Sequence, residues 1–297
     1  MPKQNSQSEQ KTSRDLLSNQ RSVVMSLAKG LRILECFGAG GEQLRQTDVA
    51  RRAGVDNATA FRFLNTLEAL GYVARHEDGR HFRLTLKCLD LGFNAIARTP
   101  LRDLAHPLLK SLVGHDVEAA SLAVQDGTAM VYIDRIQAGL ARLGIEMHIG
   151  GRVPMFSTAI GRVILAALPE DAARQLLDAS DRNPMTAQTI TSTAQILKLL
   201  PGIRKQGYAL VEGENVPGLR IIAAPILDGT GAPLAAISAA APTFGLKTQD
   251  FVSQIAPRIV AASHTLGQAM RAHGGLRSQN QPSQPPRKVT ASKQSRT

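Results

Sequence analysis

Apolar residues in the first third of the chain recur at the spacing of amphipathic helices. Residues 26–37 form a first helix that stops at a run of glycines. A shorter second helix has Thr47 as its N-cap and ends at Gly54. A third begins after its N-cap, Asp56, and ends at Gly71. The apolar positions expected to face a common core are Leu27, Leu31, Ile33, Leu34, Phe37, Val49, Ala50, Ala53, Ala60, Phe63, Leu64, Leu67 and Leu70.

A hairpin is predicted directly after the third helix. Two β-prone stretches between Tyr72 and Leu84 flank Asp78-Gly79, and Asp-Gly in that position is the strongest short hairpin signal. Helix, short helix, tight turn, helix and hairpin in this order predict a winged helix-turn-helix domain, which we place at residues 21–86.

The third helix has the polar edge that a recognition helix presents to the major groove. Short hydrogen-bonding side chains come first and an arginine follows one turn later, in the set Asn57, Thr59, Arg62 and Asn65. An ordinary surface helix shows the same pattern, so the edge alone does not establish DNA binding. The hairpin strengthens the interpretation, because it carries the basic side chains Arg75, His76, Arg80, His81 and Arg83.

Beyond the hairpin, helical periodicity gives way to alternating strands and helices. Residues 87–100 form a linker helix whose apolar positions, Leu89, Leu91, Phe93 and Ile96, suit packing on the same subunit or across a dimer. Thr99-Pro100 is the expected N-cap and first residue of the next helix. The pattern in residues 101–272 predicts an antiparallel sheet with helices on its faces, an α+β domain. Its expected strands are 119–125, 129–136, 143–149, 221–227 and 234–240, and its expected helices are 158–168, one from 170, 193–206 and 248–272 with Thr248 as N-cap.

The charge of the 297-residue chain is distributed unevenly, which supports a division of tasks. The net charge is +11. Lysine and arginine outnumber aspartate and glutamate by 15 to 10 in residues 1–98 and by 5 to 0 in residues 273–297, but only by 15 to 14 between them. A basic N-terminal module that binds a polyanion is therefore joined to a nearly neutral domain. Residues 1–20 and 273–297 are polar and aperiodic, so we expect both to be disordered.

Signatures of enzymes, cofactors and membranes are missing from the sequence. It has no nucleophile elbow, phosphate loop, dinucleotide fingerprint or paired-histidine zinc motif, so no catalytic residue, cofactor or metal is expected. The two cysteines, Cys36 and Cys88, are too few for a disulfide framework and indicate a reducing cytoplasm. No signal peptide and no apolar run of membrane length is present, so no membrane partner is expected.

One segment of the second domain has the chemistry of a carboxylate site. The loop 150–157 runs directly into a helix that begins with Thr158 and Ala159. Unpaired amides at a helix start, with a hydroxyl alongside, bind a carboxylate without any charged side chain. A simple helix cap uses the same residues, and the sequence does not decide between the two.

Over residues 22–272 the chain resembles the IclR family of bacterial transcription regulators, with matching stretches in the same order along the sequence. They include Ser-Leu-Ala-Lys-Gly-Leu-Arg-Ile-Leu at 26–34, the helix-turn-helix at 49–73, Arg83-Leu84, Leu91-Gly92, Pro154 with Thr-Ala-Ile-Gly-Arg at 158–162, the stretch 207–231 and the stretch 236–242. The resemblance implies a winged helix-turn-helix, a linker helix and a C-terminal GAF-like effector domain. It also implies a homodimer or a dimer of dimers on double-stranded operator DNA.

Two sets of site residues follow from the resemblance. The DNA-binding set is Thr47, Asn57, Ala58, Thr59, Phe61, Arg62, Arg80 and His81. The set expected to bind a small-molecule carboxylate effector is Met155, Ser157, Thr158, Ala159, Val211, Ile221, Ser238 and Ala240.

The sequence departs from the family pattern at the pocket. Family pockets often have an acidic residue, a cysteine or serine, and two serines where this chain has Val211, Ile221, Ser238 and Ala240. The pocket is therefore expected to be more apolar and to take an acid with a ring or alkyl body.

Two segments resemble one branch of the family, and the DNA helix departs from the family pattern. Residues 78–81 and 184–191 look closer to the branch that controls aromatic-acid catabolism. Asn57 and Ala58 replace the usual lysine and serine of the DNA helix, so the family's operator sequence does not transfer to this chain.

The expected function is a ligand-responsive transcriptional regulator of a catabolic operon. It acts as a repressor or as an activator, and an activator would have RNA polymerase as a partner. Two alternatives remain. One is a DNA-binding protein whose GAF-like domain only dimerises, and the other is a small-molecule enzyme with a DNA-binding appendage. A panel of organic acids separates them, because thermal stabilisation identifies a sensor and turnover identifies an enzyme.

Overall fold

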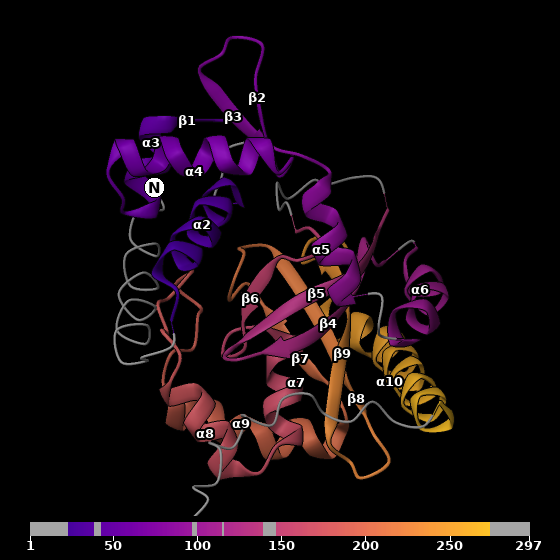
Figure 1. Ribbon diagram of the computed structural model, residues 1–297. Helices are drawn as coiled ribbons and strands as arrows, with labels where there is room; N and C mark the ends of the chain where they lie inside the picture. Colours follow the sequence, from indigo (N-terminus) through magenta and orange to yellow (C-terminus); the bar gives the residue numbers. More distant parts are fainter. Residues whose placement is uncertain (1–22, 39–42, 97–99, 115, 139–146, 274–297) are drawn as a thin grey trace, which may run out of the picture. The chain divides into compact units, whose positions relative to one another are not determined.

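The computed structural model describes residues 23–38, 43–96, 100–114, 116–138 and 147–273. The chain divides into two compact units, Met1–Ala95 and Ile96–Thr297 (Figure 1). The division falls within the segment predicted to be the linker helix, which the structure forms as α5 (Lys87–Ile96).

Before α5, the described part of the first unit consists of three helices and a small sheet (Figure 1). The helices are α2 (Met25–Glu35), α3 (Gln46–Ala53) and α4 (Asn57–Ala69), and the 3-10 turn η1 (Cys36–Gly38) follows α2. The antiparallel strands, in the order β1-β3-β2, are β1 (Leu44–Arg45), β2 (Val73–Arg75) and β3 (His81–Leu84). Gly54 and Gly71 follow α3 and α4 with φ of 64° and 78°, a left-handed backbone that glycine adopts without strain. The predicted winged helix-turn-helix is confirmed.

The first helix packs along a narrower face than its periodicity predicts. Ile33 and Phe37 lie in the core of this unit beside Leu64 and Phe82. Leu27 and Leu31, which we expected in the same core, are 63% and 51% exposed. That expectation was wrong, because the other described elements of the unit cover only one side of α2. The expectation for Leu70 was wrong as well, since this residue after the end of α4 is 53% exposed.

The start of the second helix also differs from the prediction. Thr47 is not an N-cap, since α3 begins at Gln46 with Arg45 in the capping position and no side-chain cap. The cause is the unpredicted strand β1, in which Leu44 and Arg45 pair with β3. The helix begins as soon as this strand ends.

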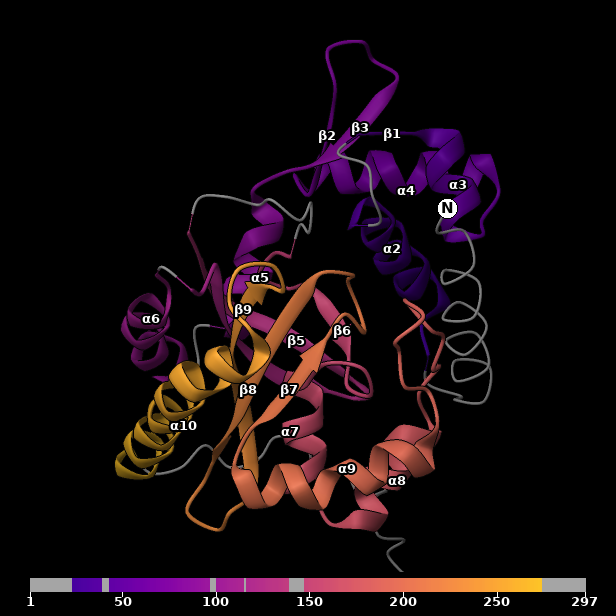
Figure 2. The same cartoon turned by 180° about the vertical axis from the view of Figure 1, so that it is seen from behind.

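A six-stranded antiparallel sheet in the order β6-β5-β4-β9-β8-β7 forms the centre of the second unit. Its strands are β4 (Ala119–Asp126), β5 (Ala129–Gln137), β6 (Arg152–Pro154), β7 (Ala209–Glu212), β8 (Leu219–Leu227) and β9 (Pro233–Pro242). Helices α6 (Pro100–Leu112) and α10 (Thr248–Ala272) pack on one face. The other face carries α7 (Ala159–Ala167), together with α8 (Glu170–Asp178) and α9 (Thr193–Gln206) (Figure 2). The predicted α+β class is confirmed.

The central strands separate two apolar cores. On β9, Ile237 and Ala239 belong to the core with α10, whereas Ala236 and Ala240 belong to the core with α7. Successive side chains of a strand point to opposite faces, and here both faces are covered. The α7 side of β9 carries small side chains, which leave space beside the sheet.

The loop before α7 lies tightly against that helix. A Cβ atom at Gly161 would lie 2.2 Å from the Cα atom of Met155, so a side chain at this position would displace the loop. Thr158 is the N-cap of α7, because its hydroxyl accepts the Gly161 N–H at 3.2 Å.

Three details of the second unit differ from the prediction. Residues 147–149 are not part of a strand, and the edge strand is β6 instead, because it is Arg152–Pro154 that pairs with β5. Strand β7 was not predicted. Thr248 is the first residue of α10 and not its N-cap, because its hydroxyl donates to the Glu212 carboxylate on β7. The expectations for Thr99, for residues 143–146 and 1–20 and for most of the tail lie outside the described residues.

Candidate functional site

Helix α4 presents a set of outward side chains to solvent. Asn57, Ala58, Phe61 and Arg62 are exposed, and Thr59 is half-buried. Phe61 is 44% exposed although it is a large apolar residue. In the described residues, no hydrogen bond or ion pair engages the guanidinium of Arg62, so it is available to an external acceptor.

The start of α4 is fixed by its cap and by α3. Asp56 accepts the Thr59 N–H at 2.7 Å and the Thr59 hydroxyl at 2.7 Å. These bonds lower the pKa of Asp56, that from the hydroxyl most. Gln46 Nε2 donates to the Asn57 carbonyl at 3.0 Å and holds α3 against this end. Thr47 is exposed on α3.

The turn of the hairpin is built around Asp78. Its carboxylate accepts the backbone N–H groups of Arg80 at 2.9 Å and His81 at 3.0 Å, and it also binds the His81 ring. The bond from Arg80 contributes most to holding the pKa of Asp78 well below its usual range. Arg45 Nε donates to His81 Nε2 at 3.2 Å. His81 is thus tied into the turn, whereas the Arg80 side chain extends into solvent.

One predicted basic residue of the hairpin is engaged inside the unit. Arg75 Nη2 donates to Asn65 at 3.2 Å and to Glu68 at 3.3 Å, and its guanidinium lies 4.5 Å from the centre of the Phe82 ring. Arg75 therefore joins α4 to the hairpin. Arg62, Arg80 and Arg83 are exposed and have no internal partner among the described residues, so they remain for a polyanion.

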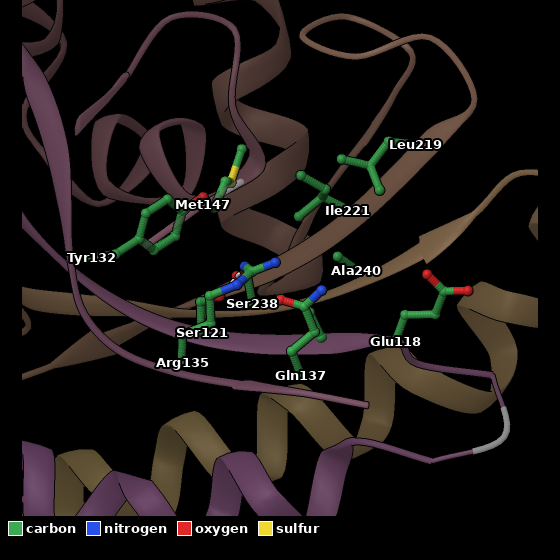
Figure 3. Close-up of a pocket in the computed structure, with 11 residues that line it drawn as sticks. Glu118, Ser121, Tyr132, Arg135, Gln137, Met147, Leu219, Ile221, Ser238 and Ala240 are labelled. Atoms are coloured by element: carbon green, nitrogen blue, oxygen red, sulfur yellow. Dashed lines mark hydrogen bonds between the residues drawn. The ribbon is translucent and has the colours of Figure 1, made fainter. Parts of the chain in front are cut away.

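In the second unit, a pocket lies on the α7 side of the sheet (Figure 3). The residues that line it are Glu118, Ala119, Ser121, Tyr132, Arg135, Gln137, Met147, Leu219, Ile221, Ser238 and Ala240. The strand register explains why they meet. Ser121 on β4 stands opposite Arg135 on β5 and opposite Ser238 on β9. Directly opposite residues in a sheet share a face, so the three polar side chains form a row.

The pairing of β4 with β5 is irregular at one point, and this places Arg135 in the pocket. Ala123 pairs with Tyr132 but Leu122 pairs with Asp134, so Ile133 is an extra residue in β5. Without it, alternation would put Tyr132 and Arg135 on opposite faces of the sheet. With it, both side chains line the same pocket (Figure 3).

The same irregularity turns Asp134 toward the opposite face. Asp134 is buried, accepts the Arg135 N–H at 2.8 Å, and binds Nδ1 of His106 on α6 at 2.9 Å. These two bonds fix the backbone of β5 where the Arg135 side chain leaves it.

The predicted effector residues fall into two groups. Ile221, Ser238 and Ala240 line the pocket. The others are buried in or beside the core between α7 and the sheet and do not line it: Met155, Ser157, Thr158, Ala159 and Val211.

The residues at the start of α7 have different hydrogen bonds. The Thr158 hydroxyl donates to the Pro154 carbonyl at 2.6 Å while it accepts from Gly161. The Ser157 hydroxyl is buried and has no hydrogen-bond partner in the part of the chain that the structure describes. Sequence reasoning missed Ser121, Tyr132 and Arg135, and a motif search offers no signal for them because the bulge brings them together.

A buried ion pair holds the domain together next to α7. Arg162 Nη1 and Nη2 donate to the two carboxylate oxygens of Glu214 at 2.6 Å and 2.7 Å. Arg162 Nε donates to the Phe156 carbonyl at 3.0 Å, and Glu214 accepts the Ile190 N–H at 3.0 Å. Three of the five N–H groups of Arg162 are thus used within the protein, one on each nitrogen, so the pair has a structural role.

Neither a cluster of metal-binding side chains nor a membrane-spanning helix is found in the residues that the structure describes. No group of three or more histidine, cysteine, aspartate or glutamate side chains there is placed to hold a metal ion. None of the described helices is long and apolar enough to cross a bilayer.

The chain is similar to known proteins over both units. Residues 26–77 match the IclR helix-turn-helix domain, and residues 93–266 match the C-terminal domain of the bacterial transcriptional regulator IclR. The HTH-type transcriptional regulator KdgR of Escherichia coli K12 is 33% identical over 87% of this chain and 96% of its own length. The Pca regulon regulatory protein of Pseudomonas putida is 31% identical over 81% of this chain and 82% of its own.

A solved structure of an IclR homolog is also similar to this chain. An IclR homolog of Microbacterium hydrocarbonoxydans complexed with 4-hydroxybenzoate is 25% identical, covers 83% of this chain and 99% of its own, and superposes with a TM-score of 0.71. The chain therefore belongs to the IclR family of bacterial transcriptional regulators, which are DNA-binding proteins and not enzymes.

Proposed function

We propose that this chain is a regulator whose affinity for operator DNA changes when a small organic acid binds in the second unit. The observation that carries the proposal is the pocket, in which one arginine and two serines stand beside apolar walls. A domain that served only for dimerisation would not need such a cavity. Names of relatives add support, since one regulates the Pca regulon and one homolog was crystallised with 4-hydroxybenzoate.

DNA binding is assigned to the outward residues of α3, α4 and the hairpin. Arg62 suits a base edge, because it projects from the recognition helix without an internal partner in the described residues. Arg80 suits a phosphate, because it extends from the tip of the wing. The rest of the proposed set is Thr47, Asn57, Ala58, Thr59, Phe61 and His81.

The effector is proposed to lie between α7 and the sheet. Two places there suit a carboxylate. One is the start of α7, with the Thr158 and Ala159 amides and the unpartnered Ser157 hydroxyl. The other is the Arg135 guanidinium. Met155, Val211, Ile221 and Ala240 would contact the body of the ligand.

We propose a dimer or a dimer of dimers, since one winged unit covers only half of a two-fold site. Exposed apolar residues on α2 and α5, among them Leu27, Leu31 and Leu89, suit a subunit contact. Light scattering at micromolar concentration tests this. A monomer that still binds its specific duplex with full affinity would contradict the dimer.

The main experiment uses a duplex that the protein itself selects from a random library. Its affinity is measured by fluorescence anisotropy with and without each acid of a panel that includes benzoate, 4-hydroxybenzoate and hexanoate. We expect at least one acid to change the affinity by about 5-fold or more, the usual size of allosteric coupling. If no aromatic or aliphatic acid changes it, the domain does not sense this class of ligand.

A further inference from the structure

The pocket of the second unit contains an arginine that forms no ion pair with any acidic group of the described residues. Arg135 Nη1 donates to Ser121 Oγ at 2.8 Å, whereas Arg135 Nε is buried without a hydrogen-bond partner among the described residues. No carboxylate of these residues forms an ion pair with Arg135. A buried donor without an acceptor is unfavourable, and a ligand that supplies the acceptor removes this cost.

Arg162, a buried arginine at the start of α7, shows what a structural arginine looks like. Arg162 has a bidentate carboxylate partner and a carbonyl acceptor for its Nε. Arg135 is half-buried and has neither of these partners among the described residues. A bound ligand can supply the missing acceptor.

Burial affects both Arg135 and the neighbouring Tyr132. Burial lowers the pKa of Arg135, because the guanidinium has lost part of its hydration. Burial also raises the pKa of the neighbouring Tyr132 to about 12, so this phenol is neutral at ordinary pH. The Ser238 hydroxyl, in the same row of the sheet, forms no hydrogen bond within the described residues and is free to donate.

The opposite end of the pocket has different chemistry. Glu118 stands away from Arg135, beyond Gln137 and near Leu219 (Figure 3). A second carboxylate on the ligand would meet the negative charge of Glu118, whereas a hydroxyl would find an acceptor there. Ile221 and Ala240 lie between the two ends and offer apolar contact (Figure 3).

We propose that Arg135, with the hydroxyls of Ser121 and Ser238, binds the carboxylate of the effector, and that the effector is a small organic monocarboxylate with an apolar body. A guanidinium presents paired donors that match the two oxygens of a carboxylate. The proposal rests on the proposed function, since it names the anchoring residue and the ligand class of the same pocket. It places the carboxylate on the sheet and not at the start of α7.

The test compares ligands that differ only in the charge of the head group. Binding of 4-hydroxybenzoate and 4-hydroxybenzamide, and of hexanoate and hexanamide, is measured by calorimetry on the full chain. In the wild type we expect at least one acid to bind about 10-fold tighter than its amide. Arg135→Gln should weaken the binding of that acid by about 10- to 100-fold, because hydrogen bonds to a charged group are lost. It should change the affinity for the amide by less than about 3-fold.

Two further variants separate anchoring from folding. Arg135→Lys keeps the charge but loses the paired donors, so it should retain part of the preference for the acid. Arg152→Gln is the matched control, because Arg152 lies exposed on the edge strand β6, outside the pocket, and pairs with Asp126. It should leave both affinities unchanged. Thermal unfolding without ligand checks that each variant is folded.

Several results would overturn the proposal. If Arg135→Gln weakens the binding of the acid and of the amide equally, Arg135 only supports the pocket wall. Unchanged affinity for the acid in this variant would place the carboxylate elsewhere while the proposed function stands. If wild-type protein binds neither acid of the two pairs, the monocarboxylate class is wrong. The proposed function fails as well only if no acid of the larger panel changes DNA affinity.

Discussion

The two units of this regulator present their unpaired arginines in different ways. Arg62 and Arg80 of the first unit extend into solvent from a helix and a wing, whereas Arg135 of the second unit lies half-buried in a pocket, without an ion-pair partner among the described residues. Exposed cations suit a polyanion, because each phosphate contact releases counterions and no enclosure is needed. An enclosed cation suits a single small anion, since electrostatic interactions strengthen as water is removed. The exposure of an unpaired arginine therefore indicates the size of its partner.

The largest expected effect is the loss of stability when the buried ion pair between Arg162 and Glu214 is broken. Unlike Arg135, Arg162 has a carboxylate partner in the described residues. Glu214→Ala leaves Arg162 buried without its carboxylate and should cost about 3–5 kcal/mol of unfolding free energy. Denaturant unfolding measures it. Glu170→Ala is the matched control, because Glu170 pairs with Arg174 at 2.9 Å on the surface and its removal should cost less than about 1 kcal/mol. Equal losses in the two variants would show that the buried pair has no special role.

The next effect concerns the two exposed arginines. Arg62→Ala should weaken binding to the selected duplex by about 1–3 kcal/mol and relax specificity at one base position. Arg80→Ala should lower affinity for all sequences and reduce the dependence of affinity on salt. Anisotropy titrations against the selected and a scrambled duplex, at several salt concentrations, distinguish the two. A footprint that neither substitution alters would contradict the DNA contacts proposed for Arg62 and Arg80.

A third prediction tests the alternative place for the carboxylate. If the start of α7 holds it, Thr158→Val should weaken the effector response by about 1–2 kcal/mol, because a hydrogen bond to a charged group is lost. Ile221→Asp should abolish the response to any anion, since it adds a like charge to the pocket. Calorimetry measures the affinity of both variants for 4-hydroxybenzoate. Normal binding by Thr158→Val together with loss in Arg135→Gln would assign the carboxylate to the sheet.

The smallest effect depends on pH and concerns the cap of α4. The pKa of Asp56 is lower in the folded chain than in the unfolded one, so its ionised form stabilises the fold above the unfolded pKa of about 4. This contribution disappears as the pH falls through the folded pKa. Asp56→Asn keeps a good N-cap that does not titrate, so wild type should lose more stability than this variant between about pH 5 and pH 2. Parallel losses would mean that the cap does not depend on charge.

The fold was largely predictable because its helices and hairpins have local signals. Gly54, Asp56 and Asp78-Gly79 mark the turns of the first unit, and each acts in the structure as its residue type suggests. Strand β1 was missed because two residues are too few for a periodic pattern. The exposure of Leu27 and Leu31 was missed because periodicity shows which residues are apolar and not what covers them.

The pocket was only partly predictable, for a different reason. Ser238, Ile221 and Ala240 were expected from family positions, and the structure brings them together. Arg135 was not expected, because regular alternation along β5 puts it on the face opposite Tyr132. The single extra residue Ile133 reverses this, and a bulge of one residue has no signature in an apolar strand.

The most direct test of the account is the response of DNA binding to an acid in wild-type protein and in Arg135→Gln. The affinity for the selected duplex is measured by anisotropy over a titration with 4-hydroxybenzoate, with Arg152→Gln as the matched control. We predict that the acid shifts the affinity of the wild type and of the control alike, and that Arg135→Gln needs about 10- to 100-fold more acid for the same shift. An identical titration curve for Arg135→Gln and wild type would contradict the account.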